Sequence, residues 1–311
     1  MTAPRRSRVV VVAGATGCVG RHVARAFLDA QYQVFGLARR GAPHVADIKF
    51  RPLDVAAAEP GQLAELFDAE QADVVINAAG GWDRTEEAMR YAHVRLVENL
   101  VDAVGATRRR PRLVQVGSIH EYGEVPDGVD IDESVPPRPG TAYAQTKHAG
   151  SAAVLRAADT GRLDAVVLRS VNVCGPYTTS ASFLGAVRDQ LRTAHPDRPV
   201  EITVAPARRD FVDVRDLAAA VLAAATAPAA GRVVNIGRGE AVLIGDLLRL
   251  LVRAAGLPSG AVVQRSAEVD SKGGGWTRAD IRVARELLGW EPQISLAESL
   301  RDMWRTGGGD R

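Results

Sequence analysis

Three glycines that follow a short apolar run near the start of the chain constrain its fold more than any other feature. Residues 8–13 are rich in valine, and Gly14, Gly17 and Gly20 come directly after them at intervals of three. Glycine adopts backbone conformations that other residues avoid and lets main-chain atoms approach closely, so this spacing is typical of a tight turn from a strand into a helix. We therefore expect a strand at 8–13 and a helix at 19–30, joined by a glycine turn.

Short apolar runs and longer amphipathic stretches then alternate along the first half of the chain. The strands of a buried parallel sheet are rich in valine and isoleucine and are joined by crossover helices. Further strands are predicted at 33–38, 48–52, 73–77, 112–117, 165–169 and 232–236, and further helices at 61–70, 85–104 and 142–159. The expected fold class is α/β, with a Rossmann-type doubly wound parallel sheet.

The glycine turn also has a chemical use. Missing side chains allow a phosphate to approach the backbone, and the helix that follows directs its N–H groups and the positive end of its dipole at that phosphate. We interpret Gly14, Gly17 and Gly20 as a dinucleotide-binding turn, with a purely structural turn as the alternative.

The regular alternation weakens after Cys174, where turn residues become frequent. We expect residues 1–174 to form a dinucleotide-binding Rossmann domain, to which 208–237 return. The remaining segments, 175–207 and 239–311, are expected to form a smaller, mostly C-terminal substrate-binding lobe within 175–311.

The end of the second predicted strand indicates which dinucleotide is bound. An NAD site usually has an acidic residue there for the adenosine ribose, whereas this chain has Arg39 and Arg40. Guanidinium groups bind phosphates well, so the two arginines favour NADP(H) over NAD(H), unless they are only a solvated pair at the end of a strand. Asp54 could accept a hydrogen bond from the adenine amino group or cap the next turn.

Tyr143 and Lys147 are four residues apart on a predicted helix, so their side chains share one face. A neighbouring cation stabilises a phenolate and brings its pKa, ordinarily about 10, closer to neutral pH. Lysine is rare in this chain, where arginine supplies almost all the positive charge, so a lysine here suggests that a compact ammonium group is needed. The two residues are candidates for proton transfer, and a surface pair of no consequence is the alternative.

Further motifs connect these features. Residues 117–123 read GSIHEYG, residues 168–176 read LRSVNVCGP, and residues 209–216 read RDFVDVRD. Together with the glycine turn, the Tyr143/Lys147 pair, Asp280 and the LGW at 288–290, these segments resemble the extended short-chain dehydrogenase/reductases along nearly the whole chain.

The resemblance implies roles for individual residues. Ser118 would hydrogen-bond the reacting carbonyl or hydroxyl, Tyr143 would exchange its proton, and Lys147 would hold the nicotinamide ribose. Asn172 and Arg209 would bind a nucleotide-diphosphate sugar; a turn-stabilising amide and a salt bridge are the alternatives for these two. The implied cofactor-binding residues also include Thr16, Cys18, Val19, Ala78 and Ala79, with space filling as the alternative for Cys18.

Departures from the family pattern indicate the reaction. Dehydratases of the family have an Asp-Glu pair after the serine or threonine, whereas this chain has Ile119 and His120, so elimination of water is not expected. The Gly-Ser-x-x-Glu-Tyr-Gly form resembles the 4-keto-6-deoxyhexose reductases, which commonly use NADPH. We expect reduction of a nucleotide-diphosphate 4-keto-6-deoxysugar. The alternatives are a nucleotide-sugar epimerase with bound NAD, a non-catalytic NADP-binding sensor and a steroid-type dehydrogenase, the last of which would leave Arg209 without an anionic ligand.

Two histidines are further departures. His120 could bind the sugar or act as a second acid, or it could simply be paired with Glu121. His93 occupies a position where the family usually has asparagine, which puts the contacts of that amide in doubt.

Composition sets the remaining expectations. The net charge is +2 and the densest basic run, 108–112, is short, so nucleic acid is not expected as a partner. No apolar run approaches an export signal or a membrane span, and two cysteines cannot build a disulfide framework or a cysteine metal site. A cytoplasmic protein without a metal is therefore expected.

The family resemblance implies a homodimer through the helix that carries Tyr143. Abundant arginine, alanine, valine and glycine are typical of a GC-rich genome such as that of an actinobacterium, which favours thymidine-diphosphate deoxysugars for antibiotic glycosides.

Overall fold

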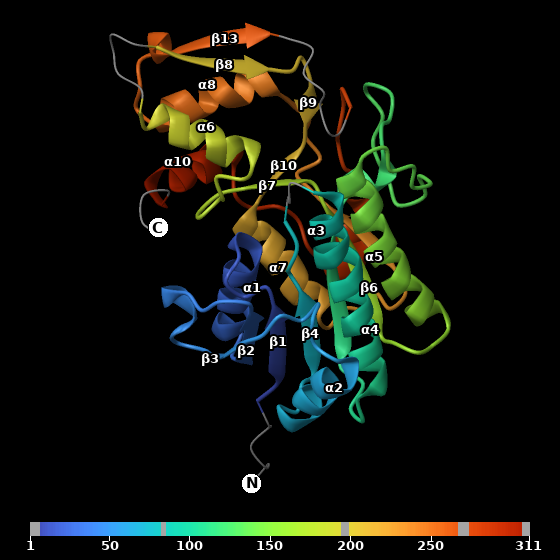
Figure 1. The fold of residues 1–311 in the computed structure, drawn as a ribbon. Coiled ribbons are helices and arrows are strands. Elements are labelled where there is room, and N and C mark those ends of the chain that lie inside the picture. The colour runs from blue at the N-terminus through green and yellow to red at the C-terminus, as the bar shows by residue number, and fades with distance from the viewer. Residues whose placement is uncertain (1–6, 82–84, 194–198, 267–273, 307–311) are drawn as a thin grey trace.

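The computed structural model describes residues 7–81, 85–193, 199–266 and 274–306, and a seven-stranded parallel sheet lies at its centre (Figure 1). The strand order is β3-β2-β1-β4-β5-β6-β11. The strands are β1 (Val9–Ala13), β2 (Gln33–Ala38), β3 (Lys49–Pro52), β4 (Val74–Asn77), β5 (Arg112–Ser118), β6 (Ala165–Ser170) and β11 (Val233–Ile236). The predicted α/β fold is confirmed, and the ends of all seven predicted strands agree with the observed ends to within one residue.

Helices cover both faces of this sheet, because alternate residues of a strand point to opposite sides. Val10 and Val12 of β1 belong to the same apolar cluster as α1 and α7. Val11 and Ala13 belong to the cluster formed with α2, α4 and α5. These five helices are α1 (Cys18–Asp29), α2 (Pro60–Ala69), α4 (Leu96–Ala106), α5 (Ala142–Asp159) and α7 (Val214–Ala224). The result is a three-layer arrangement, as the alternating sequence pattern predicts.

The single helix predicted for 85–104 is interrupted, and this part of the prediction was wrong. α3 (Glu86–Arg90) and α4 are joined by a π-helical turn over Tyr91–Arg95. A π-helical turn inserts an extra residue into a helix and often occurs at functional sites. Here it places His93 in the interior, where the side chain is 3% exposed.

A third apolar cluster lies beyond the carboxyl ends of the sheet strands, in the upper part of Figure 1. It is formed by α6 (Phe183–Leu191), β8 (Val200–Val204), α8 (Ile244–Ala254) and α10 (Leu296–Thr306), and β13 (Val262–Ser266) pairs with β8. Two short strand pairs adjoin this cluster: β7 (Asn172–Cys174) pairs with β10 (Phe211–Asp213), and β9 (Arg208–Arg209) pairs with β12 (Val242–Leu243). α9 (Arg282–Leu288) instead packs through Ala284 with the α1/α7 cluster. The predicted division into two domains at 174/175 stays a prediction.

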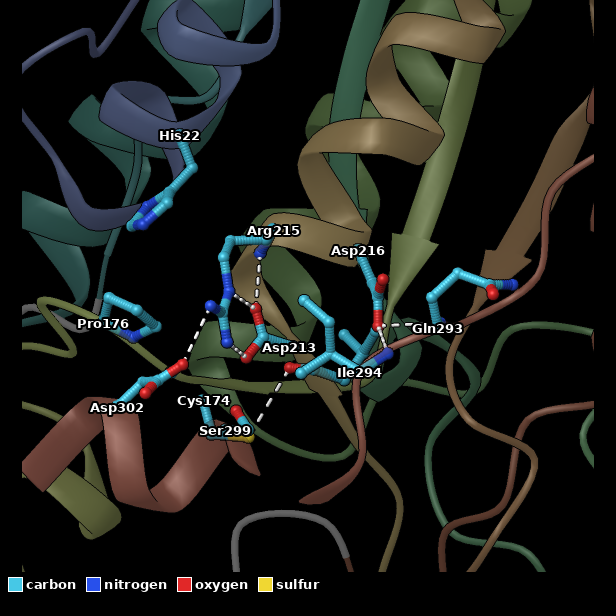
Figure 2. Close-up of polar contacts among 12 residues, drawn as sticks. His22, Cys174, Pro176, Asp213, Arg215, Asp216, Gln293, Ile294, Ser299 and Asp302 are labelled. Atoms are coloured by element: carbon cyan, nitrogen blue, oxygen red, sulfur yellow. Dashed lines mark hydrogen bonds and ion pairs between the residues drawn. The ribbon is translucent and has the colours of Figure 1, made fainter. Parts of the chain in front are cut away.

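Ionic contacts fasten α10 to α7 (Figure 2). Asp213 caps the N-terminus of α7, where its carboxylate accepts a 2.8 Å hydrogen bond from the backbone N–H of Arg215. The same buried carboxylate accepts two 2.9 Å hydrogen bonds from the Arg215 guanidinium. That guanidinium also lies 2.9 Å from the carboxylate of Asp302 on α10. Arg215 therefore connects two carboxylates from different helices.

Hydrogen bonds without a cationic partner support the same connection. The Asp216 carboxylate accepts hydrogen bonds from the backbone N–H groups of Gln293 at 3.2 Å and Ile294 at 2.9 Å, which holds the segment that leads into α10. The Cys174 thiol lies 3.2 Å from the hydroxyl of Ser299 on α10. Strand β7 and helix α10 thus meet at the position where β10 passes into α7.

We expect Arg215→Ala to lower the free energy of unfolding by about 1–2 kcal/mol, because Asp213 would stay buried without its cationic partner while the partial exposure of Arg215 limits the loss. The measurement is urea denaturation followed by circular dichroism. Arg301→Ala is the matched control, since Arg301 is an exposed arginine on α10 that is not one of these contacts. Equal stability of the two variants would show that the connection contributes nothing.

Candidate active site

A cavity of about 590 Å³ opens at the carboxyl ends of the central strands. Cys18 after β1, Ala78 after β4, Ser118 at the end of β5 and Ser170 at the end of β6 all line it. In a doubly wound sheet the ligand binds at this edge, where the strand order reverses between β1 and β4. The position of the cavity therefore follows from the fold.

The glycine turn leads into Cys18 and Val19, which line this cavity, and it fits a phosphate-binding role. Gly14 has φ +84°, and a Cβ atom there would lie 2.7 Å from the backbone of Ala79. A Cβ atom on Gly20 would lie 2.0 Å from the carbonyl oxygen of Gly14. Gly17 is the N-cap residue of α1 and provides no side-chain cap, so the first N–H groups of the helix face the turn without one. Larger residues would block this close packing.

The other residues predicted to bind the cofactor are distributed along the same edge. Val19 and Ala79 line the cavity together with Cys18 and Ala78. Thr16 is half-buried within the turn. The Asn77 side chain, which accepts a 3.1 Å hydrogen bond from the Ala79 N–H, holds the loop after β4 in place.

Arg39, Arg40 and Asp54 lie outside the lining of this cavity. Both arginines are exposed at the carboxyl end of β2. The Asp54 carboxylate accepts a 3.1 Å hydrogen bond from the Ala56 N–H and a 3.2 Å hydrogen bond from the Tyr91 hydroxyl. The turn-capping role considered for Asp54 is therefore present in the structure.

The predicted catalytic residues Ser118, Tyr143 and Lys147 come together in the cavity. β5 supplies Ser118 at its end, and α5 supplies the other two on one face, as their spacing predicts. A hydrogen bond joins the Tyr143 phenol to Ser118. The Lys147 ammonium donates a 2.7 Å hydrogen bond to the main-chain carbonyl of Val116.

The electrostatics of this group differ from the expectation that Lys147 lowers the pKa of the phenol. Burial raises the pKa of Tyr143 to about 12, against the opposing effect of its hydrogen bond with Ser118. Burial also lowers the pKa of Lys147, and the charge of Glu121 opposes this shift. The ammonium points at the Val116 carbonyl. Because the pKa of the phenol is raised to about 12, the phenol is protonated at neutral pH and can act as a proton donor.

A buried ionic network holds Ser118 in place. The Glu121 carboxylate accepts hydrogen bonds from the Ser118 N–H at 2.8 Å, the Ser151 hydroxyl at 2.9 Å and the Arg169 guanidinium at 2.9 Å. Ser118 and Glu121 together form a capping box around the 3₁₀ turn Ile119–Tyr122. Glu121 therefore has three donors of its own, and its pairing with His120 stays a prediction.

His120 and Asn172 lie together in the cavity. Burial and the nearby Arg209 lower the pKa of His120 to about 4, against the opposing effect of a side-chain hydrogen bond between His120 and Asn172. The Asn172 amide also donates a 3.1 Å hydrogen bond to the carbonyl of Asp210. The His120 ring centroid is 6.2 Å from that of Tyr143. His120 is thus a neutral polar group beside the phenol.

Arg209 contributes a cation to the same cavity. Its guanidinium donates hydrogen bonds to the main-chain carbonyls of Arg208, at 3.0 Å, and Gly274. Burial lowers the pKa of Arg209, while Glu124 and Asp127 act in the opposite direction. Two backbone carbonyls orient the guanidinium, and its positive charge suits an anionic ligand.

Part of the cavity was not predicted from the sequence. The additional residues include polar and apolar side chains from four segments, around β7, α6, β8 and β10: Val173, Thr178, Thr179, Ser182, Phe183, Thr203, Ala205 and Phe211. The one signal that could have indicated them is the cluster of hydroxyl residues between the LRSVNVCGP motif and α6. The apolar members have no local signal, because only the fold brings them to the cavity.

The cysteines are not nucleophiles in this structure. Burial raises the pKa of both Cys18 and Cys174 to about 12. Cys18 Sγ lies 3.7 Å from the Pro176 carbonyl oxygen, which agrees with a packing role. Among the residues that the structure describes, no group of three or more histidine, cysteine or acidic side chains could hold a metal ion, and no helix is long and apolar enough to cross a membrane.

Comparisons with known proteins agree with the motif analysis. The family model described as "NAD dependent epimerase/dehydratase family" matches residues 10–237. A dTDP-6-deoxy-L-talose 4-dehydrogenase (NAD(P)(+)) of Kitasatospora kifunensis is 37% identical over 98% of this chain and 97% of its own. A GDP-6-deoxy-D-mannose reductase of Pseudomonas aeruginosa is 26% identical over 93% and 94%, respectively. The structure of MoeE5 in complex with UDP-glucuronic acid and NAD has a TM-score of 0.82 at 25% identity, and the match covers 96% of this chain and 98% of MoeE5.

The pKa of His120 predicts a pH dependence of stability. The folded-state pKa of about 4 lies below the ordinary 6.5, so between these values the unfolded chain takes up a proton that the folded chain does not. This contribution to stability is complete above about pH 6.5 and is lost as the pH falls towards 4, by about 3 kcal/mol in total. We expect the free energy of unfolding of His120→Asn, measured with urea, to fall correspondingly less than that of the unchanged protein. Parallel pH curves for the two proteins would contradict the assignment.

Proposed function

The chain belongs to the NAD-dependent epimerase/dehydratase family, whose extended short-chain dehydrogenase/reductase members modify sugar nucleotides, and from this premise we propose that it reduces the 4-keto group of a nucleotide-diphosphate 4-keto-6-deoxysugar. One observation carries the proposal: the protonated phenol of Tyr143, hydrogen-bonded to Ser118, shares a cavity with the buried Arg209. The phenol and hydroxyl suit a carbonyl oxygen, and the arginine suits a diphosphate.

The side chains divide the work of such a reduction. NADPH, when bound, supplies a hydride to the carbonyl carbon. As the new C–H bond forms, the π electrons of the carbonyl move to oxygen, which takes the proton from the Tyr143 hydroxyl. Ser118 donates a hydrogen bond to that oxygen and stabilises its developing charge. The Ser118 hydroxyl, which is hydrogen-bonded to the phenol, stabilises the resulting phenolate until a proton returns from solvent, while Lys147 would hold the nicotinamide ribose.

The raised pKa of Tyr143 favours reduction as the working direction. A carbonyl reduction needs the phenol protonated at the start, and a pKa of about 12 keeps it so. The Kitasatospora kifunensis relative is named as a 4-dehydrogenase of a dTDP-6-deoxysugar, which is oxidation at the same carbon. Because hydride transfer is reversible, the oxidation in that relative's name and the proposed reduction at C4 are the two directions of one reaction. The Pseudomonas aeruginosa relative is named as a reductase.

The finer assignments follow from single features. We favour thymidine diphosphate as the nucleotide because of the name of the Kitasatospora kifunensis relative. We favour NADP(H) because Arg39 and Arg40 are exposed where an adenosine 2′-phosphate would lie. In the proposed complex, Arg209 and Asn172 hold the diphosphate and His120 contacts the sugar. A homodimer through α5 and a cytoplasmic location stay predictions.

The proposal is tested by following NADPH oxidation with freshly prepared dTDP-4-keto-6-deoxyglucose. We expect one NADPH oxidised per sugar reduced, and loss of this activity in Tyr143→Phe, which lacks the proton but keeps the ring. A changed sugar in the NMR spectrum without NADPH oxidation would instead indicate an epimerase. Cofactor binding with no change in any nucleotide sugar would indicate the sensor.

The cofactor preference is tested separately with the double variant Arg39→Ala/Arg40→Ala. Loss of charge-assisted hydrogen bonds to a phosphate should raise the KM for NADPH roughly tenfold or more and leave the KM for NADH unchanged. Arg51→Ala is the matched control, because Arg51 is an exposed arginine on the neighbouring strand β3. Equal effects on both cofactors would mean that the arginines do not read the 2′-phosphate.

A further inference from the structure

His93 is held by a hydrogen bond on each of its ring nitrogens. Its Nε2 lies 3.0 Å from the main-chain carbonyl oxygen of Gly81, in the loop after β4. Its Nδ1 lies 2.9 Å from the hydroxyl of Thr146 on α5. The ring therefore spans the space between two segments that both line the cavity, the loop through Gly81 and the helix that carries Tyr143 and Lys147.

These partners fix the protonation of the ring. A carbonyl oxygen can only accept, so Nε2 of the neutral ring carries the hydrogen and Nδ1 is an acceptor that faces the Thr146 hydroxyl. The single hydrogen of that hydroxyl is shared between Nδ1 and the main-chain carbonyls of Ala142 and Tyr143. Burial, together with the charge of Lys147, lowers the pKa of His93 to about 4, so the ring stays neutral at physiological pH. A neutral ring with one donor and one acceptor has a single orientation that satisfies both neighbours.

The ring also lies directly against the phenol of Tyr143. The two ring centroids are 5.3 Å apart and the ring planes meet at 89°, an edge-to-face contact. Thr146 is one helical turn after Tyr143, and its hydroxyl lies 3.0 Å from the Tyr143 carbonyl oxygen. His93 thus contacts the Tyr143 side chain directly and its helix through Thr146.

The surrounding backbone leaves room only for this arrangement. A Cβ atom on Gly80, which has φ +102°, would lie 2.8 Å from Cδ2 of His93. A Cβ atom on Gly150 of α5 would lie 2.3 Å from the His93 carbonyl oxygen. The π-helical turn Tyr91–Arg95 supplies the extra residue that brings His93 to this depth. Two glycines and an irregular helix thus accommodate one buried histidine.

We propose that His93 is a positioning residue, whose ring, fixed between the Gly81 carbonyl and the Thr146 hydroxyl, holds the Tyr143 phenol in the orientation from which it gives its proton to the substrate oxygen. The inference rests on the proposed function of Tyr143. His93 itself touches neither the reacting carbonyl nor the transferred proton. His93 sets the fraction of time for which the Tyr143 phenol is aligned for proton transfer. It therefore affects kcat and does not affect substrate binding.

Three variants separate the parts of this arrangement. His93→Phe keeps an aromatic edge against Tyr143 but loses both hydrogen bonds. His93→Gln keeps an N–H for the Gly81 carbonyl but loses the ring. Thr146→Val removes the partner of Nδ1, together with the bonds of that hydroxyl to carbonyls of its own helix, and leaves the ring of His93 in place. His44→Phe is the matched control, because it makes the same exchange in the 3₁₀ turn Pro43–Val45, away from the cavity.

The first readout is steady-state kinetics with NADPH and the keto sugar, after thermal unfolding has shown that each variant is folded at the assay temperature. We expect both His93 variants to lower kcat roughly 10- to 100-fold while the KM for the sugar nucleotide changes by less than about twofold. Thr146→Val should have a smaller effect of the same kind, and His44→Phe none. Folded His93 variants with unchanged kcat would overturn the proposal.

The second readout does not depend on activity. Tyrosine labelled with ¹³C at Cζ gives a resonance for Tyr143 that is identified by its loss in Tyr143→Phe. We expect this resonance to move in the His93 variants and to stay in place in His44→Phe. If the unchanged protein does not oxidise NADPH, the proposed function fails, and the spectra still decide whether His93 positions the phenol. A resonance that does not move in any His93 variant would mean that the role of His93 is only structural.

Discussion

The contact on which the rest of the site depends is the one between two stretches of backbone, the turn after β1 and the loop after β4. Gly14 allows the turn to lie against Ala79, and Gly20 allows α1 to lie against Gly14, so no side chain separates them. This close packing fixes where α1 begins relative to the sheet. It also sets the position of the loop through Gly81, which His93 then connects to α5. This one backbone contact thereby positions both the cofactor side and the proton-transfer side of the cavity.

Burial has an uneven effect on the groups inside the cavity. Tyr143, His93 and His120 are all driven towards their neutral forms, and the hydrogen bonds that they make are those of neutral donors and acceptors. Lys147 and Arg209 remain the cations, each with main-chain carbonyls as hydrogen-bond acceptors. Such a site provides hydrogen bonds to a sugar and positive charge to a phosphate. Fixed dipoles of this kind act strongly where water is excluded.

Much of this could be predicted from the sequence, because the relevant signals are local. Valine-rich runs mark the strands of the sheet, glycine spacing marks the turn, and the four-residue interval places Tyr143 and Lys147 on one face. The remaining features depend on contacts between distant residues. The π-helical turn around His93 reflects partners in the loop after β4 and on α5, and the hydrogen bond of His120 reflects a residue on β7. The raised pKa of Tyr143 reflects burial that only the assembled cavity produces. No periodicity in the chain carries this information.

The connection through Arg215 has a consequence for how the chain tolerates shortening. Asp213 ends strand β10, which begins two residues after Arg209 and pairs with the strand that starts at Asn172. The carboxylate of Asp302 near the end of the chain therefore supports, through Arg215, the strand pair beside the two residues assigned to the diphosphate. A chain cut before α10 would retain the whole parallel sheet and its glycine turn. It would lose the support for the opposite side of the cavity, so the ability to hold a dinucleotide would outlast the ability to recognise a sugar nucleotide.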